Sequence, residues 1–158
     1  MAITISDTVE IDAPPETVFD WFLELDQHYR QWHPDHRNCY WLKGGRLQPG
    51  SVLYAEEILH GQLHKLRYEM TEIEHGRFVR FRLLGAIGLL VPRGEFRIEA
   101  TPSGSRFTAT LYPRFARLLR LIIPQRVQAL VVHQQQEGRN LQSLFSDSPG
   151  SGEQPVLH

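Results

Sequence analysis

The stretch PQRVQALVVHQQQEGRNLQSLF, residues 124–145, decides the fold. It predicts one uninterrupted helix that begins at Pro124, where the missing backbone N–H of a proline costs nothing. On a helical wheel with about 100° per residue, its apolar side chains fall on one face and its long polar side chains on the other. The apolar face carries Val127, Leu130, Leu141 and Leu144, and the opposite face carries Gln135, Arg139 and Gln142. Such an amphipathic helix must cover an apolar surface formed elsewhere in the chain.

That surface is predicted to be an antiparallel sheet. Apolar and polar residues alternate over residues 3–11, which is typical of a half-buried strand. Two short helices follow, one from Pro15 to about Leu25 and one over residues 27–32, ended by Pro34. Six more strands, separated by short turns that contain glycine or proline, are expected at 38–43, 51–60, 63–73, 77–84, 93–100 and 105–112.

The order of these elements indicates an α+β fold. A curved seven-stranded antiparallel sheet would be covered by the long helical segment 116–145, which we expect to be interrupted at Pro124. A sheet that holds one helix against it leaves a cleft between the two, and this cleft is the default site for a ligand.

Composition limits the function. The 158 residues suit one domain, expected over 1–146, with a polar, disordered tail over 147–158. Lysine and arginine total 17 and aspartate and glutamate 18, so the net charge of −1 argues against a nucleic-acid binder. The single cysteine, Cys39, cannot form an internal disulfide. The sequence shows neither a signal sequence nor an apolar run of about 20 residues. We therefore expect a cytoplasmic protein without stable membrane insertion. The sequence leaves open whether it forms a homodimer.

Two polar side chains lie on the apolar face of the last helix. His133 and Glu137 fall at about −60° and −20° from Leu130, and residues four apart project side by side. A glutamate within an apolar stripe is unfavourable unless it is paired or binds a metal ion. A buried pair satisfied by Tyr68, Arg67 or the backbone is the simpler interpretation.

Two other segments carry histidine or glutamate in unusual places. His33 and His36 flank Pro34 just before the first strand of the meander, a corner expected at the mouth of the cleft. If His60-Gly61 is a two-residue turn, Glu57 faces His64 and points inward, whereas Glu56 would point inward if the turn gains a residue.

Together these residues predict a metal site. Two imidazoles and two carboxylates suit Zn²⁺, with Fe²⁺ or Mn²⁺ as alternatives. We expect the ligands to be His33, Glu57, His133 and Glu137. His36 and His64 would either support these ligands by hydrogen bonding or transfer protons. A small hydrophobic ligand would contact a mostly apolar group of cleft residues, namely Trp32, Leu66, Tyr68, Met70 and Leu130.

Four segments resemble the START-related helix-grip superfamily, also called polyketide cyclase/dehydrase-like. They are IDAPPETVFDWF (11–22), QWHPDH (31–36), LYAEEILHGQLHKLRYEMTEIE (53–74) and HQQQEGRNLQSLF (133–145). The resemblance covers roughly residues 3–146 and implies a helix-grip fold with a ligand cavity.

Within this superfamily, the histidine and glutamate positions are similar to the zinc site of the diacetylphloroglucinol hydrolase branch. That branch cleaves a carbon–carbon bond in an acylated phenol and holds zinc with two histidines and two glutamates. The resemblance implies His133 and Glu137 on the helix, Glu57 (or Glu56) on a strand, and His33 as the early histidine. This chain is much shorter than those hydrolases, so their substrate does not carry over.

Two functions follow from these observations. The first is a metal-dependent hydrolase or cyclase that acts on a small hydrophobic, aromatic or polyketide-like ligand. The second is a non-catalytic carrier of a lipid or other hydrophobic molecule. The arginines at 114, 117, 120 and 126 are compatible with contact to a membrane surface, but a solvated face is favoured because Pro124 breaks the segment.

Overall fold

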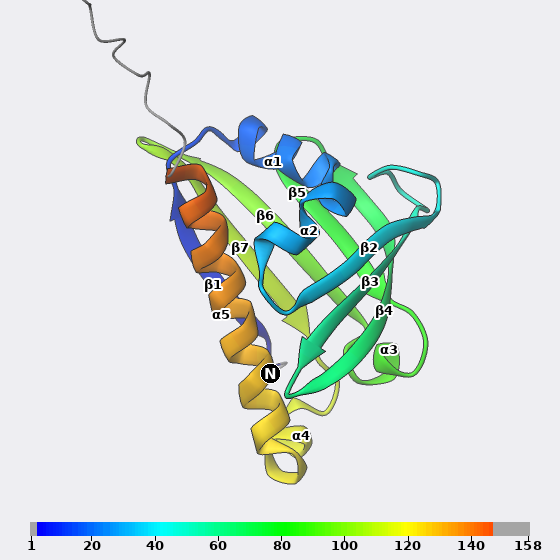
Figure 1. Cartoon of the computed structure of the whole chain (residues 1–158). Coiled ribbons are helices and arrows are strands. Elements are labelled where there is room, and N and C mark those ends of the chain that lie inside the picture. The colour runs from blue at the N-terminus through cyan, green and yellow to red at the C-terminus, as the bar shows by residue number, and fades with distance from the viewer. Residues whose placement is uncertain (1–2, 147–158) are drawn as a thin grey trace, which may run out of the picture.

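The computed structural model describes residues 3–146 and shows one sheet wrapped against one long helix (Figure 1). The predicted tail, 147–158, lies outside the described residues. The seven antiparallel strands are ordered β1-β7-β6-β5-β4-β3-β2 across the sheet. They are β1 (Ile5–Ile11), β2 (His36–Lys43), β3 (Val52–Leu59), β4 (Gln62–Glu74), β5 (Phe78–Leu83), β6 (Arg93–Thr101) and β7 (Gly104–Tyr112).

Five helices complete the described part of the chain. They are α1 (Pro15–Leu23), α2 (Leu25–Trp32), α3 (Ile87–Leu90), α4 (Ala116–Ile122) and α5 (Pro124–Ser146). The predicted α+β helix-grip architecture is confirmed, including the two short helices after the first strand and the break before Pro124. The short helix α3 lies in the connection between β5 and β6.

The helix α5 packs across one end of the sheet, beside β1 (Figure 1). Gly138 permits this close approach, since a Cβ at this position would lie 2.5 Å from Asp7 Oδ2 and 3.1 Å from Val9 Cγ1. The buried Gln134 side chain donates a hydrogen bond of 3.0 Å to the Ala109 carbonyl of β7. The middle of α5, which carries His133 and Glu137, is therefore held in a fixed position relative to the sheet.

The helices α1 and α2 lie over the concave face of the sheet and close it (Figure 1). Phe22 of α1 stacks on Phe107 of β7 and contacts Trp32 of α2 edge to face. All three side chains are almost completely buried. The aromatic core fixes α2 in place, and the chain leaves α2 directly into β2.

Candidate metal centre and ligand cavity

Four side chains from three parts of the chain converge on one point. His36 at the start of β2, Glu57 on β3, and His133 and Glu137 on α5 each offer one ligand atom, and these atoms lie within 4.8 Å of one another. The Nε2 atom of His36 is 2.8 Å from Glu137 Oε1 and 3.6 Å from Glu57 Oε2. The Nε2 atom of His133 is 3.2 Å and 3.5 Å from the same two oxygens.

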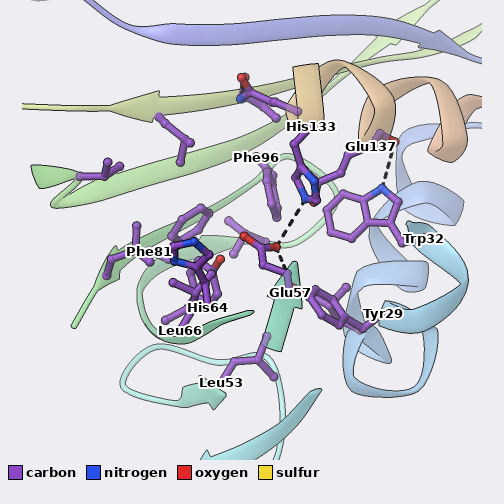
Figure 2. A pocket seen from close by; sticks show the side chains of 18 of the residues that line it. Tyr29, Trp32, Leu53, Glu57, His64, Leu66, Phe81, Phe96, His133 and Glu137 are labelled. Carbon is purple, nitrogen blue, oxygen red and sulfur yellow. Dashed lines mark hydrogen bonds and ion pairs between the residues drawn. The ribbon is translucent and has the colours of Figure 1, made fainter. Parts of the chain in front are cut away.

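The strand register selects Glu57 rather than Glu56. The β3–β4 hairpin pairs Leu59 with Gln62 and therefore Glu57 with His64, the register expected for a two-residue turn. Alternation along β3 then buries Glu57, and the Glu56 carboxylate accepts a hydrogen bond from the Tyr54 hydroxyl on the other face. Glu57 is consequently the carboxylate that points into the space between sheet and helix (Figure 2).

The structure places His36, rather than the expected His33, in one group with the two glutamates and His133. His33 belongs to a second candidate group, with His36 and His133, and which imidazoles bind a metal ion stays a prediction. The strand β2 begins at His36, two residues earlier than expected, and His36 pairs directly with Glu57 across the β2–β3 ladder. The position that the sequence assigned to ligand support or proton transfer is therefore inside the cluster.

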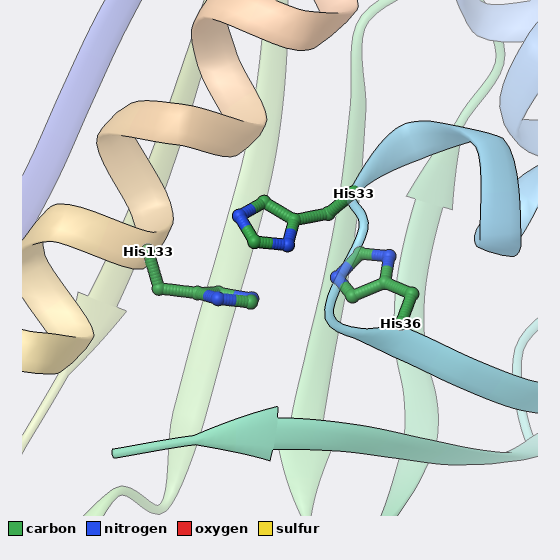
Figure 3. A group of neighbouring side chains, drawn as sticks. All are labelled: His33, His36 and His133. Carbon is green, nitrogen blue, oxygen red and sulfur yellow. The ribbon is translucent and has the colours of Figure 1, made fainter. Parts of the chain in front are cut away.

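Hydrogen bonding explains why the two histidines differ. The Nδ1–H of His36 donates to the Tyr29 carbonyl at 2.8 Å, so its Nε2 faces the carboxylates. In His33, Nδ1 accepts from the backbone N–H of Asp35 and Nε2 lies 2.8 Å from Gln136 Oε1, so both ring nitrogens have partners. Burial lowers the pKa of His33, which keeps this ring neutral. Its ring packs 4.2 Å from that of His133, between α2 and α5 (Figure 3).

Three of the four cluster side chains are almost fully withdrawn from water, and Glu137 is partly buried. His36 and His133 are 2% and 5% exposed and Glu57 is 7% exposed. The Nε2 atom of His133 is buried without a hydrogen-bond partner in the described part of the chain, although two carboxylates stand near it. An unpartnered buried nitrogen of this kind is costly and calls for a bound group or a charge interaction.

Burial and the neighbouring charges act in opposite directions on the pKa values of His133 and Glu137. Burial lowers the pKa of His133, but the carboxylates of Glu137 and Glu57 outweigh it and raise that pKa to about 10. Burial likewise raises the pKa of Glu137, yet the nearby His133 and His36 bring it down to about 2. These four side chains thus form a buried ion-pair network, in which His133 and Glu137 have His36 and Glu57 as partners rather than the Tyr68, Arg67 or backbone groups of the simpler interpretation.

Neighbouring side chains hold the cluster in place. The Tyr29 hydroxyl donates a hydrogen bond of 3.0 Å to Glu57 Oε2, and its ring stacks on His36 with centroids 3.8 Å apart. The indole N–H of Trp32 donates to the Glu137 carbonyl, and Asn140 donates back to the Trp32 carbonyl. Tyr29, Gln136 and Asn140 were not anticipated, because α2 and α5 meet only in the tertiary structure.

The cluster opens on a cavity of about 160 Å³ between the sheet and the helices (Figure 2). Its wall is mostly apolar and includes Glu57, His133 and Glu137 at one side. The five predicted ligand contacts, Trp32, Leu66, Tyr68, Met70 and Leu130, all line this cavity, as does His64. Their contact with a ligand stays a prediction. Burial, followed by the charges of Glu57 and Glu137, raises the pKa of Tyr68 well above its usual range, so its hydroxyl stays protonated.

Comparisons with solved structures show the same fold at low sequence identity. Protein Ms6760 from Mycobacterium smegmatis has a TM-score of 0.71 at 15% identity, over 94% of each chain. Major latex-like protein 151 from Panax ginseng has a TM-score of 0.70 at 13% identity, over 91% of this chain and 97% of that one. The di-domain ARO/CYC BexL from the BE-7585A biosynthetic pathway has a TM-score of 0.70 at 17% identity, over 94% of this chain and 51% of that one.

A search of curated proteins found no match. The profile of one protein family, described as "Polyketide cyclase / dehydrase and lipid transport", matches residues 2–138, most of the chain. This range includes the aromatic core, the strands that line the cavity and the four clustered side chains. The chain belongs to the polyketide cyclase/dehydrase and lipid transport family.

Proposed function

We propose that this protein binds one zinc ion through His36, Glu57, His133 and Glu137 and acts as a metal-dependent hydrolase or cyclase on a small aromatic or polyketide-like ligand. The observation that carries the proposal is the convergence of four ligand atoms within 4.8 Å of one another, among them the buried Nε2 of His133, which has no hydrogen-bond partner within residues 3–146. The zinc pattern of the diacetylphloroglucinol hydrolase branch resembles this set, with His36 in the place expected for His33.

The spacing of the ligand atoms fits such an ion. Tetrahedral ligands about 2.0 Å from zinc lie about 3.3 Å from one another. The four separations between imidazole nitrogens and carboxylate oxygens range from 2.8 to 3.6 Å, and all four ligand atoms lie within 4.8 Å of one another. The hydrogen bond from His36 Nδ1 to the Tyr29 carbonyl is the arrangement that typically orients a ligating histidine.

Zinc at this point would supply a Lewis acid that polarises a carbonyl group. The protonated Tyr68 hydroxyl, on the cavity wall, would donate a hydrogen bond to an oxygen of the ligand. His64 pairs with Glu57 across the β3–β4 ladder and lines the same cavity, where it is placed to exchange a proton with the ligand. The apolar wall excludes water from the remaining surface of the ligand.

Cavity size narrows the class of ligand. About 160 Å³ is close to the volume of an apolar cavity that holds a benzene molecule. Phe81 and Phe96 of the sheet and Phe22 of α1 form part of the wall, which suits a flat ring. We therefore expect a ligand built on a single aromatic ring that carries an oxygen substituent directed toward the cluster.

Metal analysis tests the proposal. The zinc content is measured by inductively coupled plasma mass spectrometry. The protein is analysed as purified without added metal, and again after dialysis against a chelator followed by reconstitution with zinc. We expect one equivalent of zinc in the natural chain and none in His133→Ala or Glu137→Gln. The matched control is His64→Ala, which removes a cavity imidazole outside the cluster and should retain the zinc. Absence of stoichiometric zinc from the folded, reconstituted protein would overturn the proposal.

The second candidate is a non-catalytic carrier, favoured by the apolar cavity and by the lipid-transport members that the family description includes. In that case the ion-pair network would only orient the ligand. Extraction of bound small molecules, followed by mass spectrometry, distinguishes the carrier from the metal-dependent enzyme. A metal-free protein that co-purifies with a lipid supports the carrier.

A further inference from the structure

The end of the molecule formed by α3 and α4 exposes large apolar side chains. We call this the α3–α4 surface; it consists of Leu89, Leu90, Phe115, Leu118, Leu121 and Ile122, with the four arginines described below. Leu121 is 80% exposed and Phe115 is 67% exposed. The two segments are adjacent, since the backbone N–H of Arg114 donates a 2.7 Å hydrogen bond to the Leu90 carbonyl. Several large apolar side chains exposed on two adjacent segments are typical of an interaction surface.

The charge around this surface has one sign. Arg114, Arg117, Arg120 and Arg126 are all exposed, and residues 111–136 contain no aspartate or glutamate. None of the four forms an ion pair within residues 3–146. The sheet arginines differ, because Arg80 and Arg106, for example, are each paired with a glutamate. The arginines of the α3–α4 surface are therefore available to an external anion.

From this combination we infer that the α3–α4 surface docks on an anionic lipid bilayer. At the surface of a bilayer, apolar side chains contact the acyl chains and arginines contact the lipid phosphate groups. The α3–α4 surface offers both kinds of side chain. Docking is peripheral, as no helix of the described residues is long and apolar enough to span a membrane. The four arginines are exposed, as expected for a solvated face, and the exposed Leu121 and Ile122 among them add the apolar part of the interface.

The same surface adjoins the ligand cavity. Ile87 and Val91, in and just after α3, line the cavity, whereas Leu89 and Leu90 between them face solvent. The helix α3 is thus a thin wall between cavity and docking surface. The docking itself is independent of zinc, so its test does not depend on the proposed function.

Vesicle binding tests the inference. Full-length protein is sedimented with vesicles of phosphatidylcholine alone or with about one third phosphatidylglycerol, at low and high salt. We expect binding to the anionic vesicles that weakens as salt rises, and little binding to phosphatidylcholine. The natural chain already contains three tryptophans, so Leu121→Trp is compared with it. The additional emission of the variant should shift to the blue on anionic vesicles and be quenched by brominated acyl chains. Binding to a soluble polyanion such as heparin without that spectral shift would overturn bilayer docking.

Two sets of variants locate the surface. Arg117→Glu with Arg120→Glu should weaken binding at least about thirtyfold, since each arginine near an anionic surface contributes about fivefold. Leu121→Ser with Ile122→Ser should weaken it while leaving the charge unchanged. The control, Arg46→Glu with Arg77→Glu, makes the same change in net charge at exposed sites outside the surface. If the control weakens vesicle binding as much as Arg117→Glu with Arg120→Glu, the inference fails.

Discussion

The Nε2 atom of His36 lies 2.8 Å from Oε1 of Glu137, although 101 residues separate them in the sequence. The first strand of the meander and the last helix thus share one buried polar contact. Since the Nδ1–H of His36 donates to the Tyr29 carbonyl, Nε2 is the ring nitrogen that faces the Glu137 carboxylate. This contact gives His36, and not His33, the central place in the cluster.

His36 and His33 should therefore differ in metal binding. We expect His36→Ala to lower zinc affinity at least about a hundredfold, because it removes a ligand, and His33→Ala to retain one equivalent. Titration with a competing zinc chelator measures both affinities. The reverse order would restore the assignment made from the sequence.

Tyr29 should act as a positioning residue. Its hydroxyl orients Glu57, so Tyr29→Phe should lower zinc affinity about tenfold while keeping the ring that stacks on His36. Tyr54→Phe is the matched control, because the Tyr54 hydroxyl donates to Glu56 on the other face of β3. Equal zinc affinities in the two variants would show that the Glu57 contact does not contribute.

Gln134 should contribute more to the free energy of unfolding than the adjacent Gln135 does. Gln134→Ala leaves the buried carbonyl of Ala109 without its side-chain donor and should lower the free energy of unfolding by about 1–2 kcal/mol. The adjacent Gln135 is exposed, so Gln135→Ala should change it by less than about 0.5 kcal/mol. Urea unfolding followed by circular dichroism compares the two; similar losses would exclude a specific role for the buried amide.

Gly94 should be required for the packing of the Phe81 ring in the cavity wall. It pairs with Phe81 across the β5–β6 ladder, and a Cβ at this position would lie 2.5 Å from the Phe81 ring. Gly94→Ala should displace that ring, which lines the cavity, and lower the free energy of unfolding by about 1–3 kcal/mol. Thermal and urea unfolding give the cost. In a Phe81→Leu background the same substitution should cost less, and an unchanged cost would place the strain elsewhere.

Cys39 should be unreactive in the folded protein. Burial, with a smaller contribution from the charge of Asp26, raises the pKa of its thiol to about 12. A thiol of ordinary pKa is about half ionised near pH 8.5, whereas folded Cys39 stays protonated there, so alkylation by iodoacetamide should be at least about a hundredfold slower than in urea. The raised pKa stabilises the fold fully below about pH 9, and this contribution declines as pH rises toward 12. Rapid alkylation without denaturant would contradict this assignment.

The sequence alone determined the fold class and much of the cavity wall. The period of the last helix, the alternation of the strands and the turn residues are local signals, and they placed His133 and Glu137 on the inner face of α5. The register of the β3–β4 hairpin is also local, because a two-residue turn fixes it, and it directed Glu57 inward.

Only the tertiary structure decided between His33 and His36 and revealed the α3–α4 surface. The choice between the histidines depends on a ladder between β2 and β3 that begins two residues earlier than the turn signals indicate, and on Gln136, more than 100 residues away from His33. Leu121 and Ile122 are exposed because no other element covers their side of α4 in the described part of the chain. The periodicity of one short segment does not predict which elements pack against it. Local signals specify elements and faces, whereas packing of distant elements decides which polar atoms meet and which apolar side chains stay exposed to solvent.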